Sequence, residues 1–262
     1  MLKIIASMTT LPTRFDKIKT SIVSILQQVN SLEINIPYIC KRTNEEYIIP
    51  EWLTKMERVK IYRCEDNGPA TKILDTLKRH SDKYIFIMDD DTFYQQNIIS
   101  ELLKESRKKR AVCTSGIKFV NNKYIQVKSG LVEVMEGFGG ILLPPQVYND
   151  FAYFSIVLKN DDCFLGDDVV FSNWLKKQGF ELWKAKAQMP SQLLFGLSDP
   201  SALHKQNNMC KRYFRILTWL NKNDLLYIET DKKNCEDNKI NYIEEKNTID
   251  TTNTIEKIDA VD

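Results

Sequence analysis

Three consecutive aspartates, Asp89, Asp90 and Asp91, directly follow the apolar run "YIFIM" at residues 84–88. Neighbouring carboxylates repel one another, and the repulsion grows where water is partly excluded, so a positive group is expected beside them. In an extended segment Asp89 and Asp91 point to one side and Asp90 to the other. Carboxylate oxygens favour Mg²⁺ or Mn²⁺, with open positions left for water and phosphate oxygens. The spacing therefore predicts that Asp89 and Asp91 bind one divalent cation.

A plainer interpretation of the same residues is a solvated turn. Asp91 or Thr92 would then cap the helix that follows, because short polar side chains accept hydrogen bonds from the first N–H groups of a helix. A cap requires one acid and not three, so the cation site is the preferred interpretation.

A second acidic pair, Asp167 and Asp168, begins the segment "DDVVFSNWLKKQGF", which has helical periodicity and ends at Gly179 and Phe180. Carboxylates at the start of a helix can serve a bound molecule or act as simple caps. The sequence leaves both roles open for this pair.

An anion site is predicted further upstream, in "DNGPATK" at residues 66–72. This segment reads as a turn before a helix, with Lys72 in the first helical turn. A helix N-terminus with a nearby ammonium group attracts anions. A solvated lysine that follows a Gly-Pro turn is the alternative.

Strand and helix patterns alternate in the part of the chain that leads to the aspartates. Pro37 marks either an edge strand or the end of a strand. The alternation implies a mostly parallel sheet with helices on both faces, and ligands of such sheets bind beyond the carboxyl ends of the strands. Strands are predicted at residues 3–8, 32–38, 58–64 and 84–88, and helices at residues 15–28 and 70–80.

The second half of the chain has a different pattern. Residues 117–127 read as a β-hairpin, residues 130–145 as a strand that passes into a glycine-rich turn, and residues 209–220 as a last helix. Gly139 and Gly140 lie in the turn. Backbone without side chains either lets a sugar approach closely or simply permits a tight bend.

The length and charge of the chain suggest one domain and a tail. We expect residues 1–228 to form a single α/β domain within the 262 residues. Residues 229–262 contain ten acidic and five basic residues and lack Gly and Pro, so a flexible tail is expected there. These residues therefore have a net charge of −5. Because the whole chain has a net charge of +2, residues 1–228 have a net charge of +7 and are basic. That balance suits a polyanionic small molecule, although a lysine-rich solvated surface would give it too.

Composition argues against several other classes of protein. Basic residues are not interleaved with aromatic ones, so no nucleic-acid partner is expected. The six cysteines and two histidines do not form the pattern of a zinc site or a disulfide framework. The N-terminus lacks a continuous signal-peptide core, and no segment approaches the roughly 20 apolar residues of a membrane span. We therefore expect a soluble, cytoplasmic protein.

The segment "IFIMDDDTFY" resembles the Asp-x-Asp motif of metal-dependent sugar-nucleotide glycosyltransferases with the A-type fold. Together with the segments below it covers about residues 1–215, and the whole resembles small family-2-like glycosyltransferases, including ones from viruses and bacteria. The resemblance implies the glycosyltransferase-A fold, with a mostly parallel, Rossmann-like central sheet, helices on both faces and a small β-hairpin region for the acceptor. The supporting segments, in chain order, are "SMTTLPTRF", "EDNGPATKIL", "EGFGGILLPP", "CFLGDDVVFSNWLKKQGF" and "ALHKQNN".

The resemblance also implies a reaction. A nucleoside-diphosphate sugar, expected to be uridine-based, would pass its sugar to a hydroxyl group of a glycan or glycoprotein acceptor, with Mn²⁺ or Mg²⁺ as cofactor. Inversion at the sugar carbon is expected because it needs only one base. Asp168 is the preferred base for the acceptor hydroxyl and Asp167 is the alternative.

The resemblance assigns the remaining roles to residues as follows. Two of these residues have plainer alternatives, since Arg14 and His204 could each be an ordinary surface side chain. The metal ligands would be Asp89, Asp91 and His204, and the acceptor would contact Gly139 and Gly140. The donor would be bound by Thr9, Thr10, Arg14, Asp66, Lys72, Asp89 and Asp90.

Four other functions compete with this interpretation. An aspartate-nucleophile phosphatase also carries Asp-x-Asp after a strand, but its motif requires Thr or Val where Phe93 stands. A polymerase palm places Gly-Asp-Asp in a hairpin, whereas residues 166–180 have helical periodicity. A sugar-nucleotide nucleotidyltransferase should have a glycine-rich loop after its first strand, and "TTLPTR" contains no glycine. A non-catalytic nucleotide-sugar binder would show metal-dependent binding without turnover.

Overall fold

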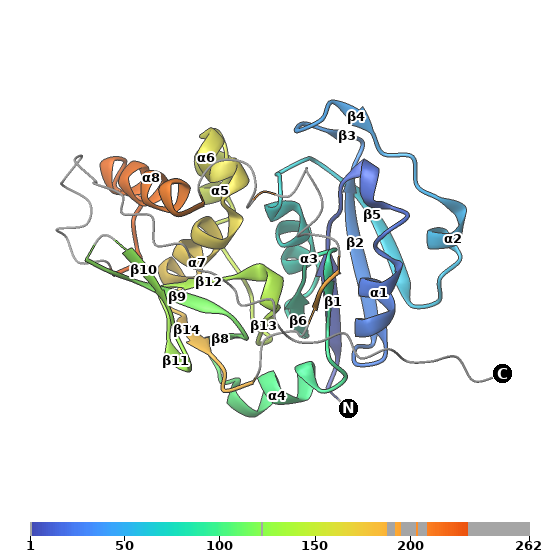
Figure 1. Cartoon of the computed structure of the whole chain (residues 1–262), viewed down its shortest axis with the longest axis horizontal. Coiled ribbons are helices and arrows are strands. Elements are labelled where there is room, and N and C mark those ends of the chain that lie inside the picture. Colours follow the sequence, from blue (N-terminus) through green and yellow to red (C-terminus); the bar gives the residue numbers. More distant parts are fainter. Residues whose placement is uncertain (1, 122, 188–191, 195–202, 204–208, 230–262) are drawn as a thin grey trace, which may run out of the picture.

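Strand β1 lies inside an eight-stranded sheet, and all five of its residues are buried. The computed structural model describes residues 2–121, 123–187, 192–194, 203 and 209–229. Across the sheet the strand order is β11-β14-β8-β13-β6-β1-β2-β5 (Figure 1). The strands of this sheet are β1 (Ile4–Met8), β2 (Ser31–Pro37), β5 (Val59–Cys64), β6 (Tyr84–Ile87), β8 (Arg110–Cys113), β11 (Gly130–Leu131), β13 (Ile141–Leu143) and β14 (Glu181–Lys184).

The sheet is parallel in the half that the first part of the chain builds. The pairs β5–β2, β2–β1 and β1–β6 are parallel, as is β8–β14. Strand β13 runs antiparallel to both β6 and β8, and β11 runs antiparallel to β14. Pro37 is the last residue of the inner strand β2, so of its two predicted places the strand end is correct. The predicted α/β architecture with a mostly parallel central sheet is confirmed.

Side chains alternate between the two faces of the sheet and build two cores. Ile5 and Ile85 pack on one face with helices α3, α5, α7 and α8. Ala6 and Phe86 pack on the other face with α1 and α4. Helices therefore cover both faces, as predicted. The helices are α1 (Lys19–Leu26), α2 (Glu51–Thr54), α3 (Leu74–Arg79), α4 (Ile98–Glu105), α5 (Ala152–Val157), α6 (Asp161–Leu165), α7 (Asp167–Lys177) and α8 (Met209–Lys222).

Two predicted helices are shorter than their apolar patterns. The prediction for residues 15–28 was too long, because a 3₁₀ turn, η1 (Pro12–Arg14), and further turns precede α1. The predicted helix at residues 70–80 is divided into a 3₁₀ turn, η2 (Ala70–Lys72), and α3. The turn at Gly68-Pro69 leads into a 3₁₀ turn and not an α-helix, because the N–H groups after it donate to carbonyls three residues earlier.

Three small sheets flank the large one. Strands β9 (Gly116–Val120) and β10 (Lys123–Gln126) form the predicted hairpin, and β12 (Val134–Met135) pairs with β9. The strand predicted within residues 130–145 is divided into short strands, and the glycine-rich turn is present as predicted. The chain there changes sheets, because β11 pairs with β14, β12 pairs with β9, and a 3₁₀ turn, η3 (Gly137–Gly139), leads into β13.

The other two small sheets are antiparallel pairs of two-residue strands. Strand β7 (Thr92–Phe93) pairs with β15 (Gln192–Leu193). Strands β3 (Ile39–Cys40) and β4 (Glu45–Glu46) form a hairpin in the connection between β2 and β5. In Figure 1 this hairpin projects beyond the carboxyl ends of β2 and β5.

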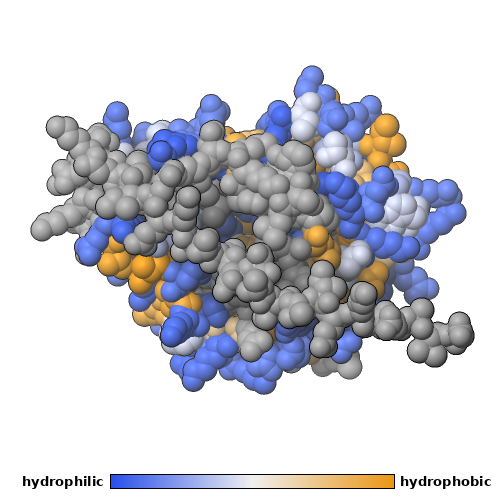
Figure 2. All heavy atoms as spheres, in the orientation of Figure 1, coloured by the Kyte–Doolittle hydropathy of each residue, from blue (hydrophilic) through white to orange (hydrophobic). Residues whose placement is uncertain are grey.

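The described part of the chain contains no helix that is both long and apolar enough to cross a membrane. Among the residues that Figure 2 colours, most on this face are hydrophilic, and hydrophobic side chains gather over β10 and β11, where Ile125 and Leu131 are exposed. The tail expected at residues 229–262 lies outside the described residues apart from Glu229.

Candidate active site

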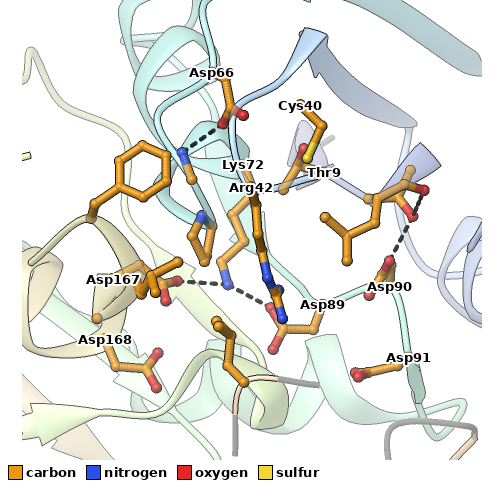
Figure 3. Close-up of a pocket in the computed structure, with 18 of the residues that line it drawn as sticks. Thr9, Cys40, Arg42, Asp66, Lys72, Asp89, Asp90, Asp91, Asp167 and Asp168 are labelled. Carbon is orange, nitrogen blue, oxygen red and sulfur yellow. Dashed lines mark hydrogen bonds and ion pairs between the residues drawn. The ribbon is translucent and has the colours of Figure 1, made fainter. Parts of the chain in front are cut away.

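A pocket of about 330 Å³ lies where strands β1, β2, β5 and β6 end and helix α7 begins (Figure 3). This is the edge of the sheet at which ligands of parallel sheets collect. The loop after each strand contributes to the lining, and so do α7 and α8. The predicted site residues that line the pocket are Thr9, Thr10, Arg14, Asp66, Lys72, Asp89, Asp90, Asp91, Asp167 and Asp168.

The side chain of Lys72 joins two groups of carboxylates in this pocket. Its Nζ lies 2.5 Å from Asp89 Oδ1 and 2.8 Å from Asp167 Oδ2, and 5% of the side chain is exposed. Burial opposes the charge of the ammonium group, but the carboxylates of Asp167, Asp89 and Asp168 outweigh it and raise the pKa of Lys72 well above its ordinary value. Lys72 therefore stays charged and ties the end of β6 to the start of α7.

Asp90 is held by the loop that follows β1. Its Oδ1 accepts a hydrogen bond from Arg14 Nη1 at 2.8 Å, and its Oδ2 accepts one from Thr10 Oγ1 at 2.6 Å. All three side chains are buried. Burial raises the pKa of Asp90, although Arg14 and Thr10 act in the opposite direction. Thr10 and Arg14, which the resemblance assigned to the donor, thus join the loop after β1 to the loop after β6.

Asp91 carries a carboxylate whose charge is poorly compensated. Arg14 Nη1 lies 3.8 Å from Asp91 Oδ2, which is beyond hydrogen-bonding distance. Burial, followed by the negative charges of Asp90 and Asp89, raises the pKa of Asp91 to about 7. In Figure 3 the carboxyl groups of Asp89 and Asp91 point to the same side of the pocket. A hard divalent cation would relieve this repulsion, so the residues present fit Mg²⁺ or Mn²⁺.

The described residues hold no cluster of three or more His, Cys, Asp or Glu side chains arranged around one metal position. A cation at Asp91 would therefore complete its coordination with water and ligand oxygens, as Mg²⁺ commonly does. The capping alternative for this segment is wrong. The next helix, α4, has Asn97 at its N-cap, and Thr92 lies in β7.

Asp168 is half-buried and accepts hydrogen bonds from two other elements. Gly137 N–H in η3 donates to its Oδ1 at 2.8 Å, and Tyr213 OH in α8 donates to its Oδ2 at 3.0 Å. Burial and then the negative charge of Asp167 raise the pKa of Asp168 well above its ordinary value. The neighbouring Asp167 instead faces Lys72. The two carboxylates predicted at the start of α7 thus have distinct surroundings.

A protein-family model described as "Glycosyl transferase family 2" matches residues 14–162, which include Lys72 and all three aspartates of the cluster. The chain belongs to glycosyl transferase family 2. Membership makes it a glycosyltransferase and implies a nucleotide-sugar donor and an acceptor. It favours this function over the phosphatase, polymerase and nucleotidyltransferase alternatives. Asp167 and Asp168 lie just beyond the matched residues.

Two other comparisons add little to this assignment. No curated protein matches the chain. A solved structure from Bacillus anthracis, described as a glucose-1-phosphate thymidylyltransferase in complex with a sucrose, aligns with a TM-score of 0.41 and 11% sequence identity, covering 81% of this chain and 99% of that one. The family assignment therefore rests on the family model.

In this glycosyl transferase family 2 chain, Thr9 and Asp66 line the pocket while bonding to the protein itself. Thr9 Oγ1 donates to Asn35 O at 2.8 Å. Asp66 Oδ2 accepts from Lys41 N–H at 2.6 Å, and its Oδ1 accepts from Gly68 N–H at 2.7 Å. Each carboxylate oxygen has a second lone pair, so Asp66 can still accept a bond from a ligand.

Gly139 and Gly140, predicted for the acceptor, are buried and pack behind the pocket. A Cβ on Gly139 would lie 2.4 Å from Thr114 Oγ1, and one on Gly140 would lie 2.3 Å from the ring of Phe86. The two glycines therefore let η3 approach the large sheet closely. His204, predicted as a metal ligand, lies outside the described residues.

Several pocket residues had no signal in the motifs of the sequence. They come from the β3–β4 hairpin and from α8, whose positions depend on tertiary packing. These residues are Arg42, Tyr47, Arg212 and Tyr213.

A buried polar network beneath the pocket holds the backbone of Lys72. Ser7 Oγ donates to Lys72 O at 2.5 Å and lies 2.7 Å from Thr76 Oγ1. Hydrogen-bonded side chains on β1, β2 and α3 thus fix the turn that carries Lys72, because an unpaired polar group at this depth would be costly. The network continues through Asn35, Glu33 and Arg79.

Proposed function

We propose that this glycosyltransferase transfers a sugar from a uridine-based nucleoside diphosphate to a hydroxyl group of a glycan or glycoprotein, with inversion at the sugar carbon. The observation that carries the proposal is that one pocket contains both Asp91 and Asp168. Asp91 would bind a divalent cation, and Asp168 would accept a proton from the acceptor hydroxyl group. Lys72 lies between the two ends of this pocket and contacts Asp89 and Asp167. The donor diphosphate and the acceptor hydroxyl would occupy these two ends.

A divalent cation, Mn²⁺ or Mg²⁺, would be held by Asp91 with Asp89 beside it. When bound, it supplies positive charge that stabilises the diphosphate leaving group. Asp89 already accepts a hydrogen bond from Lys72, so Asp91 would be the principal ligand and Asp89 would chiefly orient Lys72. Burial, followed by the negative charges of Asp90 and Asp89, raises the pKa of Asp91 to about 7, and a bound cation would compensate that charge.

Asp168 fits the role of base better than Asp167. The carboxylate of Asp167 is paired with Lys72 at 2.8 Å, so it is already engaged by a cation. Asp168 accepts two hydrogen bonds but retains lone pairs for a third, and burial raises its pKa. In the proposed step Asp168 takes the acceptor hydroxyl proton, the acceptor oxygen bonds to the anomeric carbon, and the C–O bond to the diphosphate breaks with its electron pair on the phosphate oxygen.

The cation and the donor are tested together by thermal shift. The protein is incubated with UDP-glucose, UDP-galactose and UDP-N-acetylglucosamine, each with Mn²⁺ and with EDTA. We expect one donor to raise the Tm only when Mn²⁺ is present. Asp91→Asn should abolish this shift, whereas Asp82→Asn, at an exposed residue outside the pocket, should retain it. A shift that persists in EDTA, or in Asp91→Asn, would remove the metal from the proposal.

The base is tested with the donor that binds. Asp168→Asn should keep the metal-dependent thermal shift and slow sugar transfer by about 100-fold or more, because general-base catalysis contributes that much. Asp167→Asn should disturb donor binding first, since it releases Lys72 from one carboxylate. Transfer at the normal rate by Asp168→Asn would show that another group takes the proton.

A further inference from the structure

The β3–β4 hairpin is fixed to the loops that line the pocket. Lys41 N–H donates to Asp66 Oδ2 at 2.6 Å, and Lys41 Nζ donates to Asp66 O at 2.7 Å. On the other arm of the hairpin, Tyr47 OH donates to Thr10 O at 2.9 Å. These bonds join the hairpin to the loop after β5 and to the loop after β1.

The edge strand β5 secures the base of the same hairpin. Arg63 Nη1 donates to Pro37 O at 2.8 Å, and Arg63 Nη2 donates to Tyr47 O at 3.0 Å. A single guanidinium group thus holds both ends of the hairpin. The hairpin is a built wall of the pocket, because anchors at its base and along its sides restrict its movement.

Arg42 lies in the tight turn of this hairpin. Asn44 N–H donates to Cys40 O at 2.7 Å, and Asn44 has a φ of 56°. The side chain of Arg42 lines the pocket together with Asp89 and Asp91. In Figure 3 it extends from the hairpin toward the part of the pocket that holds Asp89.

The two cations that the sequence assigned to the donor are committed to carboxylates. Lys72 contacts Asp89 and Asp167, and Arg14 donates to Asp90. Both cations are buried, whereas Arg42 is half-buried. Turning Lys72 or Arg14 toward a phosphate group would leave a buried carboxylate without its partner, which is costly. Arg42 enters the pocket from a different wall, the β3–β4 hairpin.

We propose that Arg42 binds the diphosphate of the nucleotide-sugar donor, an inference that rests on the proposed function. A guanidinium group is planar and presents five N–H donors, which suits two-point binding of phosphate oxygens. Its fixed positive charge faces the place where negative charge develops as the diphosphate leaves. Arg42 thereby provides a phosphate contact from the hairpin wall of the pocket.

The proposal is tested by calorimetric titration in excess Mn²⁺. UDP, GDP, ADP, CDP and dTDP are first titrated into the wild-type protein to find the base that binds best. The diphosphate, the monophosphate and the nucleoside of that base are then titrated into each variant. Arg42→Ala should weaken diphosphate binding by about tenfold or more, the usual effect of losing a charge-assisted hydrogen bond. Arg42→Lys should retain part of the affinity, and nucleoside binding should not change. Lys60→Ala, which removes one positive charge from an exposed position on β5, is the matched control and should bind as the wild type does.

The other possible results of the titration would each contradict one part of the proposal. Diphosphate binding by Arg42→Ala at the wild-type level would overturn the role of Arg42 and leave the proposed function intact. Equal weakening of diphosphate and nucleoside would show that Arg42 shapes the hairpin and does not bind phosphate. If the wild-type protein bound none of the five diphosphates, the proposed function would fail and the role of Arg42 with it.

Discussion

Lys72 Nζ lies 2.5 Å from Asp89 Oδ1, so an ammonium group from the turn after β5 meets the first aspartate at the end of β6. The chain itself thus supplies part of the positive charge that three adjacent carboxylates require. Arg14 supplies a second part by pairing with Asp90. Asp91 remains the member of the cluster with a pKa raised to about 7. A cation that binds here would therefore act mainly on Asp91.

Lys72→Met tests how much the buried pairs contribute to stability. The change keeps the length of the side chain but leaves Asp89 and Asp167 without the ammonium group. We expect the free energy of unfolding, measured by urea denaturation, to fall by about 3 kcal/mol, as is usual when one partner of a buried ion pair is removed.

A second substitution separates lost charge from lost packing. Asp167→Asn on the Lys72→Met background removes one of the two carboxylates that have lost the ammonium group. The double variant should therefore recover part of the lost free energy of unfolding. A loss below about 1 kcal/mol in Lys72→Met would show that these pairs behave like exposed ones. No recovery in the double variant would indicate that the loss came from packing.

The early strands and the loops that follow them could be predicted from sequence. Apolar runs marked β1 and β6, and the parallel arrangement brings the ends of such strands to one edge of a sheet. The resemblance to sugar-nucleotide glycosyltransferases assigned Arg14, Lys72 and Asp89 to one donor site, and the strand ends explain why these residues share one edge of the sheet. Periodicity and turn residues carry enough local information for this step.

Contacts between distant segments could not be predicted in the same way. The sequence offers Arg14 and Asp90 separately, and their pairing depends on how two loops pack. The antiparallel strand β13 depends on a change of sheet that no local pattern marks. Tyr213 reaches Asp168 only because α8 packs against α7, so neither its role nor that of Arg42 had a signal in the motifs.

Tyr213→Phe should shift the pH dependence of sugar transfer. Tyr213 OH donates to Asp168 Oδ2 and stabilises the carboxylate, so its removal should raise the pKa of Asp168 further. Under the proposed mechanism, transfer requires deprotonated Asp168 and declines as the pH falls through this pKa. The acidic limb of the kcat profile should therefore move to higher pH by about half a unit to one unit.

Tyr148→Phe serves as the control for that profile. Tyr148 is also buried, but its OH donates to Pro144 O, outside the pocket lining. Its profile should match that of the wild type in shape. An acidic limb that stays in place in Tyr213→Phe would argue that Asp168 does not limit transfer on the acidic side.

Gly140→Ala should destabilise the fold through two separate effects. Gly140 has a φ of 84°, which strains any residue with a Cβ, and the new Cβ would lie 2.3 Å from the ring of Phe86. We expect a loss of about 3 kcal/mol in the free energy of unfolding. Gly130→Ala separates the two effects, because Gly130 has a φ of 110° with open space around its Cβ position. Gly130→Ala should lower the free energy of unfolding by about 1 kcal/mol. Equal losses in the two variants would show that the contact with the Phe86 ring does not destabilise Gly140→Ala.

Glu33 makes the stability of the protein depend on pH. Its buried carboxylate lies 2.6 Å from His80 Nε2, and its Oε2 accepts hydrogen bonds from Arg79 Nη2 at 2.7 Å and from Arg79 Nε at 3.0 Å. Burial opposes the charge of Glu33, but the hydrogen bonds from His80 and Arg79 outweigh it and lower the pKa of Glu33. The unfolded chain therefore binds this proton more readily than the folded chain does.

A lowered pKa in the folded state fixes the sign of the effect. The stabilising contribution of Glu33 is fully present above its unfolded pKa of about 4.3 and is lost as the pH falls through the lower folded value. Glu33→Gln removes this dependence. Urea denaturation from pH 7 to pH 3 should show the largest difference between wild type and Glu33→Gln above about pH 5, and the difference should narrow toward pH 3. A difference that stayed constant over the whole range would mean that the shape of the side chain, and not its charge, stabilises β2 against α3.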